Sequence, residues 1–401
     1  DNATPINANI FEVQDNGGTD IFEVGVTYIA GFGGNATGAR SMAIGSSAQA
    51  YSDDVIVLGG TQNTITSSNS NSGDVIFGGY SHQIHAGSGY NAIIAGRYGT
   101  IENSAASSAI LAGDRNEIDN STFSAIIGGR SHDIENSSAR SAIRGGTACV
   151  INGADSGISL GATGAKVFGN ASSIISSRSQ NGFPMSITGT YSSIIGSRNS
   201  QIRSSGDLAV VAGSNAVIVD NATYFFAGAT SGSYVYNASQ RCSIIGGQTH
   251  RMGEYGNAQA NSVIVGGASH KMNSASAEGR NAILGGRSAG ITGSAFRSAV
   301  VAGTDNIMRS SNSAICGGYD NQAYGGSRAF MGGGTDNYIS SGGSNHAIVG
   351  GTQNEINTSN PQNCFVGGGQ NNDILDGPRR SAIIGGLNNA IGGEISGQVN
   401  D

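Results

Sequence analysis

Four of the six histidines occupy one position of a recurring segment, four residues after a glycine. They are His82, His132, His250 and His270. Imidazole nitrogens are common metal ligands, so histidines on neighbouring strands ~4.8 Å apart could form a metal-binding ladder. Asn fills this position in many other copies of the segment. That exchange favours histidines that replace Asn at a solvent-facing corner, and we predict no metal site.

The cysteines show no spacing that indicates chemistry. They lie far apart in the sequence and form no Cys-x-x-Cys pair or metal-ligand pattern. They are Cys149, Cys242, Cys316 and Cys364. We expect free, mostly buried thiols, which favours assembly in a reducing compartment. The sequence therefore predicts neither a metal nor another cofactor.

The acidic residues do not converge in a pattern that indicates catalysis. Asp53 and Asp54 form the only adjacent acidic pair, and neighbouring residues of a strand point to opposite faces. Cleavage of a glycan would require two carboxylates a few ångströms apart. We interpret the pair as part of a solvated loop and predict that the chain is not an enzyme. Carboxylates from different subunits leave a glycan-cleaving alternative open.

Tyrosines are better candidates for recognition, because each offers a flat apolar face and a hydroxyl. Tyr80, Tyr98, Tyr319 and Tyr324 lie in or just after glycine corners, outside the apolar segments. We therefore name them candidate ligand-binding residues. The alternative is that they are scattered surface side chains.

A second aromatic group lies between about 165 and 240, where the repeat described below is irregular. Breaks in a regular scaffold often carry binding. Tyr224, Tyr234 and Tyr236 are therefore further ligand-binding candidates. The competing interpretation is that these tyrosines and the phenylalanines beside them fill a wider section of the core.

An internal repeat of the form Ser-x-Ile-Ile-Gly-Gly-x-x-Asn-x-Ile positions these residues. The 401-residue chain contains 66 Gly and only 4 Pro, which departs from globular composition and from collagen. About twenty copies follow one another in steps of mostly 15 to 20 residues. Their first glycine, or its substitute, lies at Gly59, Gly78, Ala95, Ala112, Gly128, Gly145, Gly161, Gly196, Ala212, Ala227, Gly246, Gly266, Gly285, Ala302, Gly317, Gly332, Gly350, Gly367 and Gly385.

Each repeat contains two apolar segments separated by the glycine turn and followed by a variable loop. Such a unit cannot bury its apolar side chains alone, so copies must stack and share a core. Gly-Gly permits positive φ at the corner, and Asn or His four residues after the first glycine fits a second corner, because both tolerate left-handed φ. The sequence predicts an all-β protein, a parallel β-solenoid of the β-roll or β-helix type.

The first apolar segment of each repeat is apolar on both faces. In segments such as Ala125–Ile127 and Val263–Val265 successive side chains point to opposite sides. One side fills the solenoid, and the other needs a second apolar surface. We predict that further copies of the chain supply it in a parallel homotrimer.

Charge and hydropathy exclude other classes of partner. The net charge is −7 at pH 7, and the 20 Lys and Arg residues are scattered along the chain, so no basic stripe indicates nucleic-acid binding. Apolar runs such as 56–58 are too short to cross a bilayer, and no charged and apolar leader precedes Asp1. We predict neither nucleic-acid binding nor membrane insertion.

Residues 41–50, SMAIGSSAQA, resemble one turn of the YadA-like head of trimeric autotransporter adhesins, whose repeats read Ser-x-Ala-Ile-Gly-x-x-Ala-x-Ala. Residues 381–391 are similar to longer Gly-Gly-x-x-Asn variants of that repeat. The resemblance covers about residues 38–393, with a gap near 165–195. It implies a left-handed β-roll in each subunit and three rolls packed about one axis.

The N-terminal segment has a different character. Ile-Phe-Glu-Val occurs at 10–13 and again at 21–24, across a polar Gly turn, which predicts two short strands. This resembles linker modules of phage tail fibres and spikes. We expect a stalk or linker module at 1–37, a Gly-rich solenoid at 38–393 with an irregular belt at about 165–240, and a tail or junction at 394–401.

Together the resemblances imply a viral tail fibre or receptor-binding shaft, located in the virion. Its partners would be its own copies in a homotrimer and a glycan or protein of the host cell surface. The alternatives are a bacterial trimeric adhesin at the cell surface and a polysaccharide-degrading tailspike.

Overall fold

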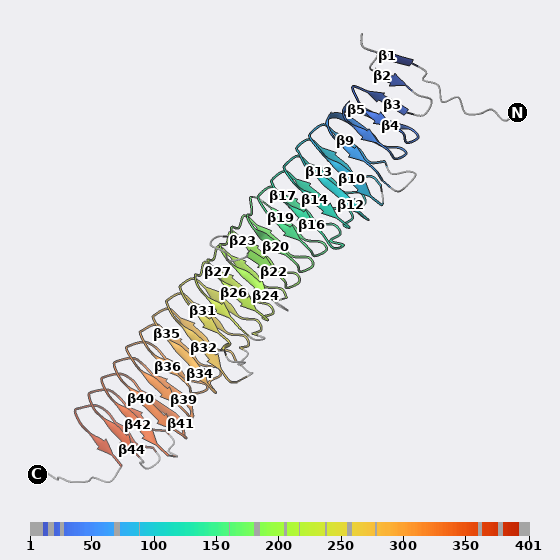
Figure 1. The fold of residues 1–401 in the computed structure, drawn as a ribbon. Coiled ribbons are helices and arrows are strands. Elements are labelled where there is room, and N and C mark those ends of the chain that lie inside the picture. The colour runs from blue at the N-terminus through green and yellow to red at the C-terminus, as the bar shows by residue number, and fades with distance from the viewer. Residues whose placement is uncertain are drawn as a thin grey trace, which may run out of the picture. The chain divides into compact units, whose positions relative to one another are not determined.

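Each turn of the chain contributes one strand to each of two stacked parallel sheets (Figure 1). The computed structural model describes residues 11–14, 20–24, 28–67, 73–87, 89–159, 161–179, 185–203, 207–215, 217–236, 239–254, 259–276, 279–359, 363–375 and 380–392. Within these residues the protein is all-β, without an α-helix, and forms a parallel β-solenoid of about 19 turns. The predicted all-β parallel β-solenoid is confirmed. Residues 1–10 and the tail predicted at 394–401 lie outside the described part.

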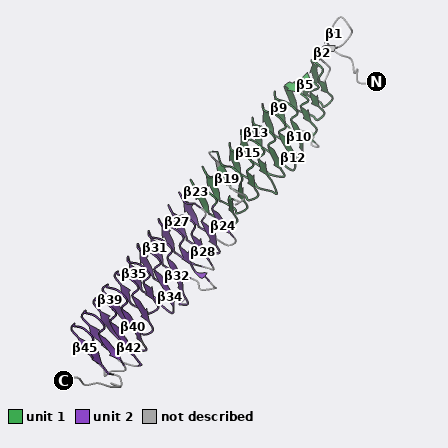
Figure 2. Ribbon diagram, turned by 60° about the vertical axis from the view of Figure 1, so that its left-hand side comes forward, with its two compact units in different colours: residues 1–199 green, residues 200–401 purple. Residues whose placement is uncertain are grey.

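The chain divides into two compact units, residues 1–199 and 200–401 (Figure 2). In unit 1 the first sheet contains β1 (Phe11–Gln14), β2 (Asp20–Val24), β3 (Tyr28–Gly31), β5 (Ser41–Ser46), β7 (Ile56–Thr61), β9 (Val75–Phe77), β11 (Ala92–Ile94), β13 (Ala109–Leu111), β15 (Ala125–Ile127), β17 (Ala142–Arg144), β19 (Gly157–Ser159), β21 (Ser173–Ile175) and β23 (Ser193–Ile195). Its second sheet contains β4 (Asn35–Ala36), β6 (Gln49–Ala50), β8 (Thr64–Ile65), β10 (Gln83–Ala86), β12 (Thr100–Asn103), β14 (Glu117–Asp119), β16 (Asp133–Ile134), β18 (Val150–Ile151), β20 (Ala165–Val167) and β22 (Met185–Ile187).

Unit 2 repeats this arrangement. Its first sheet contains β25 (Val210–Ala212), β27 (Phe226–Gly228), β29 (Ser243–Ile245), β31 (Val263–Val265), β33 (Ala282–Leu284), β35 (Ala299–Val301), β37 (Ala314–Ile315), β39 (Ser327–Met331), β41 (Ser344–Ile348), β43 (Phe365–Val366) and β45 (Ala382–Ile383). Its second sheet contains β24 (Gln201–Arg203), β26 (Ile218–Asp220), β28 (Tyr234–Val235), β30 (Arg251–Met252), β32 (Lys271–Ser274), β34 (Gly290–Gly293), β36 (Ile307–Met308), β38 (Gln322–Tyr324), β40 (Tyr338–Ser341), β42 (Glu355–Thr358), β44 (Asp373–Leu375) and β46 (Ala390–Ile391).

Equivalent residues of successive turns lie side by side. Ile126 pairs with Ile110 on one neighbouring strand and with Ile143 on the other. At the start of unit 1, β1, β2 and β3 pair antiparallel, and the parallel stacking begins where β3 pairs with β5. Within each unit, the described strands of the belt at 165–240 keep the same parallel register.

In three-residue strands of the first sheet such as β15, the middle residue points into the roll and the residues on either side point out. Ile126 is 0% exposed, whereas Ile127 is 43% exposed. The second sheet contributes the other half of the core, through residues such as Ile118 and Ile134. The two sides of the apolar segment therefore have different surroundings, as strand alternation predicts.

The glycine corner differs from its sequence-based description. Asn and His at the fourth position do not adopt positive φ. That conformation belongs to the residue before them, as at Ser131 with φ of 55°. Asn337 instead turns inward, is 0% exposed, and donates from Nδ2 to the carbonyl oxygens of Gly333 and Gly351 at 3.0 Å each. A Cβ at Gly334, where φ is +90°, would lie 2.1 Å from the Gly351 oxygen, so only glycine fits beside this Asn.

Candidate functional site

The histidines at the fourth position are buried inside the corner, so the prediction that they face solvent was wrong. His132 accepts a hydrogen bond at Nδ1 from the backbone N–H of Cys149 at 3.2 Å. His250 and His270 stack with their ring centroids 5.0 Å apart. The pKa of His250 is lowered to about 4, mainly by burial and to a smaller extent by the neighbouring His270. His82 has the same environment, accepting from Gly99 at 3.0 Å.

The cysteines occupy two environments. Cys149, Cys242 and Cys364 are buried and free, as predicted for most of the thiols. Burial raises the pKa of Cys242 to about 11, which suppresses its thiolate. Cys316 is also free but is exposed, directly after Ile315 of β37 on the outer side of the first sheet.

The adjacent acids at 53 and 54 are held by the preceding turn and do not form a fully solvated loop. Asp53 accepts a hydrogen bond from the backbone N–H of Ala39 at 2.6 Å. Asp54 forms a two-point ion pair with Arg40 at 2.5 Å. The hydrogen bond and charge of Arg40 lower the pKa of Asp54. The two carboxylates therefore link this turn of the solenoid to the preceding one.

Two of the corner tyrosines form a cluster in unit 1. Tyr80 and Tyr98 meet edge to face with ring centroids 5.5 Å apart, and the guanidinium of Arg115 lies 5.6 Å from the Tyr98 centroid. The same corner contains Arg97 and Asp114, which are 3.1 Å apart. All of these side chains except Asp114 are exposed.

Stacking also collects arginines that are scattered in the sequence. Arg97, Asp114 and Arg130 lie on consecutive turns of one column, and Arg178 and Arg198 lie farther along it. The sequence showed no basic stripe, but the fold places these four arginines in one column at the glycine corner of unit 1.

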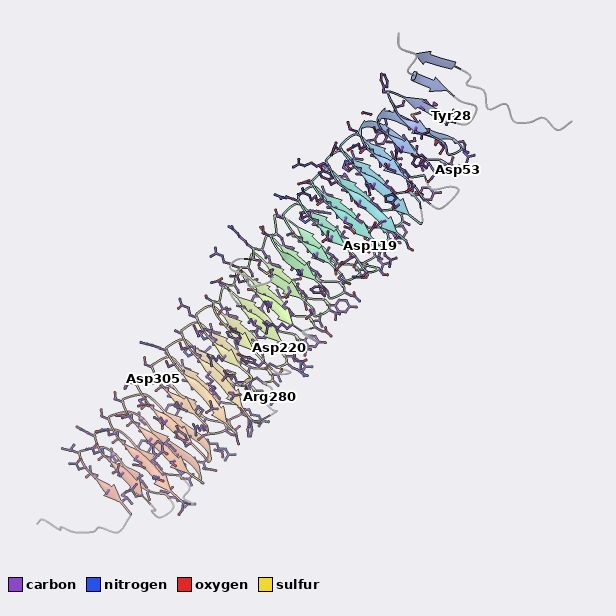
Figure 3. All side chains as sticks on the ribbon, in the orientation of Figure 1. Tyr28, Asp53, Asp119, Asp220, Arg280 and Asp305 are labelled. Atoms are coloured by element: carbon purple, nitrogen blue, oxygen red, sulfur yellow. The ribbon has the colours of Figure 1, made fainter. Side chains whose placement is uncertain are left out.

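The remaining candidates do not join this cluster. Tyr319 lies exposed at a glycine corner of unit 2. Tyr224 lies exposed at the opposite corner with φ of 52°, while its neighbour Phe225 is buried and Phe226 is exposed. The two corners are distinct edges of the ribbon in Figure 3, where Asp305 marks the glycine corner and Arg280 the opposite one.

Three candidate tyrosines share the outer face of the second sheet of unit 2. Tyr234 and Tyr236 stack with their ring centroids 5.8 Å apart at β28, and Tyr324 contacts Tyr338 at 5.6 Å where β38 meets β40. The six strand steps from β28 to β40 span about 29 Å at ~4.8 Å each. We call the outward-facing residues of these strands the groove face.

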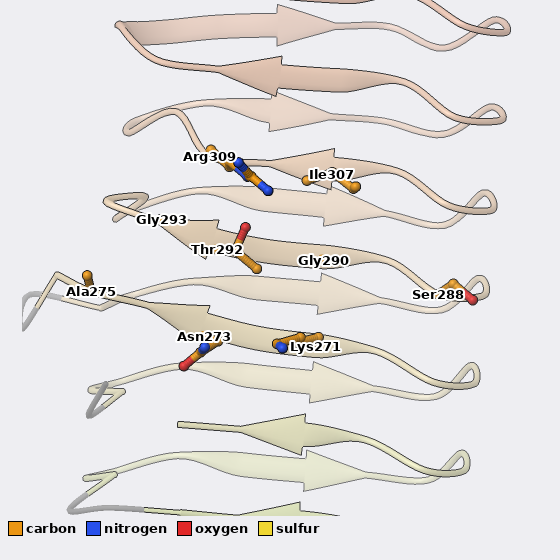
Figure 4. A pocket seen from close by; sticks show the side chains of 9 residues that line it. All are labelled: Lys271, Asn273, Ala275, Ser288, Gly290, Thr292, Gly293, Ile307 and Arg309. Carbon is orange, nitrogen blue, oxygen red and sulfur yellow. The ribbon is translucent and has the colours of Figure 1, made fainter. Parts of the chain in front are cut away.

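A hollow of about 540 Å³ lies midway along the groove face, over Gly290 (Figure 4). Gly290 stands in one column between Lys271 and Ile307, and its missing side chain indents the surface. Asn273 and Thr292 stand side by side in the next column. The Oδ1 atom of Asn273 and the Oγ1 atom of Thr292 are buried and have no hydrogen-bond partner within the described part of the chain.

Cationic side chains border this hollow. The guanidinium of Arg309 lies 4.4 Å from the ring centroid of Tyr324. Glu254 pairs with Lys271 at 2.8 Å and with Arg251 at 3.0 Å. Burial raises the pKa of Glu254, but Lys271 and then Arg251 lower it by more. Arg251, Lys271 and Arg309 outnumber the single carboxylate of Glu254, so this part of the groove face carries a positive charge.

Sequence reasoning missed Lys271, Asn273, Gly290, Thr292 and Arg309. A signal was present in the sequence. Each of these residues lies directly before or directly after the second apolar position of its repeat, where strand alternation points the side chain outward. Aligning the repeats on that position would have shown these residues as neighbours.

Comparison with known proteins found no matching family model and no matching curated protein. Among the described residues, no helix is long and apolar enough to cross a membrane.

Proposed function

We propose that the chain is the shaft or head of a trimeric adhesive fibre, carried by a viral tail and attached to a glycan or protein of the host surface without cleaving it. The observation that carries this proposal is an apolar strip on the outer side of the first sheet. On five consecutive turns of unit 1 the outward residue after the core position is large and apolar, and each is between 38% and 43% exposed. These residues are Leu58, Phe77, Ile94, Leu111 and Ile127.

The first sheet of unit 2 has outward apolar residues of its own in the equivalent column, such as Ile245 and Leu284, which are 44% and 40% exposed on the single chain. A contiguous apolar surface of this kind marks an interaction site in soluble proteins. Copies of the same chain fit it well, because the turns of parallel rolls stand at equal heights and bring equal residues together. Three copies would also present three identical attachment sites, which supports multivalent binding to a cell surface.

Ile126→Asp and Ile127→Asp separate the two faces of this strand. Ile126→Asp buries a charge inside the roll, so we expect loss of folded protein in circular dichroism. Ile127→Asp places a charge on the strip, so we expect loss of the trimer in sedimentation equilibrium. Gln83→Asp, on the exposed outer side of the second sheet, is the matched control and keeps the trimer mass.

A well-folded wild-type monomer at micromolar concentration would contradict the trimer. So would an Ile127→Asp protein with an unchanged mass. A correctly assembled trimer that binds no whole cells would instead indicate a structural spacer.

A further inference from the structure

The hollow over Gly290 holds two polar atoms that the described structure leaves unsatisfied. A buried oxygen without a hydrogen bond costs about 1–3 kcal/mol, and such atoms in a concave site indicate a missing partner. The Oδ1 of Asn273 accepts hydrogen bonds, and the hydroxyl of Thr292 both donates and accepts. Ligand hydroxyl groups match both atoms.

The charge around the hollow selects among hydroxylated ligands. Arg309 is exposed, and no acidic group pairs with it among the described residues. Tyr324 supports its guanidinium from one side at 4.4 Å, which limits the freedom that binding would remove. Lys271, which also pairs with Glu254 at 2.8 Å, adds a second cation in the other outward column. Two cations beside hydroxyl partners favour a ligand with a carboxylate.

A second hollow continues the groove face beyond Tyr324. Its volume is about 500 Å³, and Tyr324, Ser340, Asn357 and Thr358 contribute to its lining. Asn357 is an outward, exposed residue of β42 in this lining. Two polar-lined hollows, one on each side of the Arg309 and Tyr324 pair, suit a polymer with repeating units.

We propose that the groove face binds an acidic polysaccharide, with one carboxylate-bearing sugar seated over Gly290. Asn273 and Thr292 bind sugar hydroxyls, Lys271 and Arg309 bind the carboxylate, and Tyr324 positions Arg309. The inference rests on the proposed attachment role and deepens it, because it names the chemical class of the receptor.

Gly290→Leu tests the site by filling the hollow. A Cβ at Gly290 meets nothing closer than 3.9 Å, and its φ is not positive, so the fold should accept the change. Gln83→Leu adds the same side chain at the equivalent outward position of β10 in unit 1, outside the groove face, and is the matched control. Binding of the full-length protein is measured by calorimetry with oligogalacturonate and with oligosialic acid as carboxylate-bearing probes and with dextran oligomers as the neutral probe.

We expect wild type and Gln83→Leu to bind one or both carboxylate-bearing probes and to ignore dextran. Gly290→Leu should weaken that binding at least tenfold with an unchanged thermal midpoint. Arg309→Gln should weaken it and reduce its dependence on salt. Equal binding by Gly290→Leu and wild type, equal binding of dextran, or no binding of either acidic probe overturns the inference.

The two proposals fail separately. A trimer that attaches to cells but ignores both acidic probes removes the saccharide site and keeps the fibre. A monomer that binds a probe in a Gly290-dependent manner keeps the site and removes the fibre.

Discussion

Histidine replaces Asn inside the glycine corner because the two side chains offer the same acceptor. Asn116 accepts the backbone N–H of His132 at Oδ1, at 3.1 Å, and His132 accepts that of Cys149 at Nδ1, at 3.2 Å. Only a neutral imidazole can accept at Nδ1. The Nε2 atom of His132 is buried and has no partner within the described residues. Each such histidine therefore makes the fold sensitive to acid.

His250→Asn should remove part of this acid sensitivity. The pKa of His250 is about 4 in the folded protein, below the ~6.5 of an exposed histidine. Between these values the unfolded chain takes up a proton that the folded chain does not. The free energy of unfolding therefore falls as the pH decreases from about 6.5 to about 4, by roughly 3 kcal/mol for this group.

Thermal unfolding between pH 7 and pH 4 measures the effect. We expect the midpoint of His250→Asn to fall less than that of wild type, while His85→Asn, at an exposed histidine, follows wild type. Parallel curves for all three proteins would show that His250 is not buried in its neutral form.

The strands of this solenoid are short, and their stability comes from ladders that run across turns. At the corner of unit 2 the backbone N–H of Asn354 donates to Asn337 Oδ1 at 3.1 Å, while Asn337 donates to two glycine carbonyls. Asn337 also donates to Oδ1 of Asn321 in the preceding turn at 3.0 Å, so it joins three successive turns. These hydrogen bonds explain why Asn recurs at the fourth position of the repeat. Its backbone φ is not positive, so a left-handed conformation is not the reason.

Asn337→Ala should destabilise the protein by about 3 kcal/mol, because the carbonyl of Gly333 and the N–H of Asn354 lose their side-chain partner and the carbonyl of Gly351 keeps only the N–H of Thr335. Asn357→Ala, at an exposed residue of β42, should change stability by less than about 0.5 kcal/mol. Denaturant unfolding monitored by circular dichroism compares them. Equal midpoints for the two variants would rule out the ladder as a source of stability.

At the level of elements, the repeat pattern predicted the strands well. Apolar segments such as 125–127 became β15, and alternation correctly separated the environments of Ile126 and Ile127. The role of Asn337 could not be read in the same way, since both a left-handed corner and an inward hydrogen bond select Asn. Only the backbone positions of the neighbouring turns distinguish the two.

For the whole molecule, the stacking of turns places residues that are distant in sequence side by side. Contacts of this kind could not be predicted from the sequence, whereas single candidate residues could. Tyr234, Tyr236 and Tyr324 were named as candidates from residue type together with an irregular stretch of the repeat or a glycine corner, and not from any predicted contact between them. Lys271 and Gly290 are 19 residues apart in sequence and adjacent on the sheet, and variable loops between repeats conceal that spacing. The tyrosines did not form one site, because the glycine corner and the second sheet point in different directions.

Cys316 provides an internal test of the assembled molecule. It is the one exposed thiol of the four, and it follows Leu284 and Val301 along the apolar strip of unit 2. If copies of the chain cover this strip, a thiol reagent should not reach Cys316 in the native protein. We expect no alkylation of native wild type, measured by mass spectrometry, and four alkylated thiols per chain in denaturant.

Leu284→Asp, two turns from Cys316 on the same strip, should expose it by disrupting the proposed packing, so that one thiol per chain reacts under native conditions. Gln322→Asp, on the outer side of the opposite sheet, introduces the same charge and should leave Cys316 protected. The three other thiols are buried within single rolls and report loss of folding if they react as well. Rapid alkylation of one thiol in native wild type would mean that the first sheet faces water, and the argument for a trimer would then lose its physical basis.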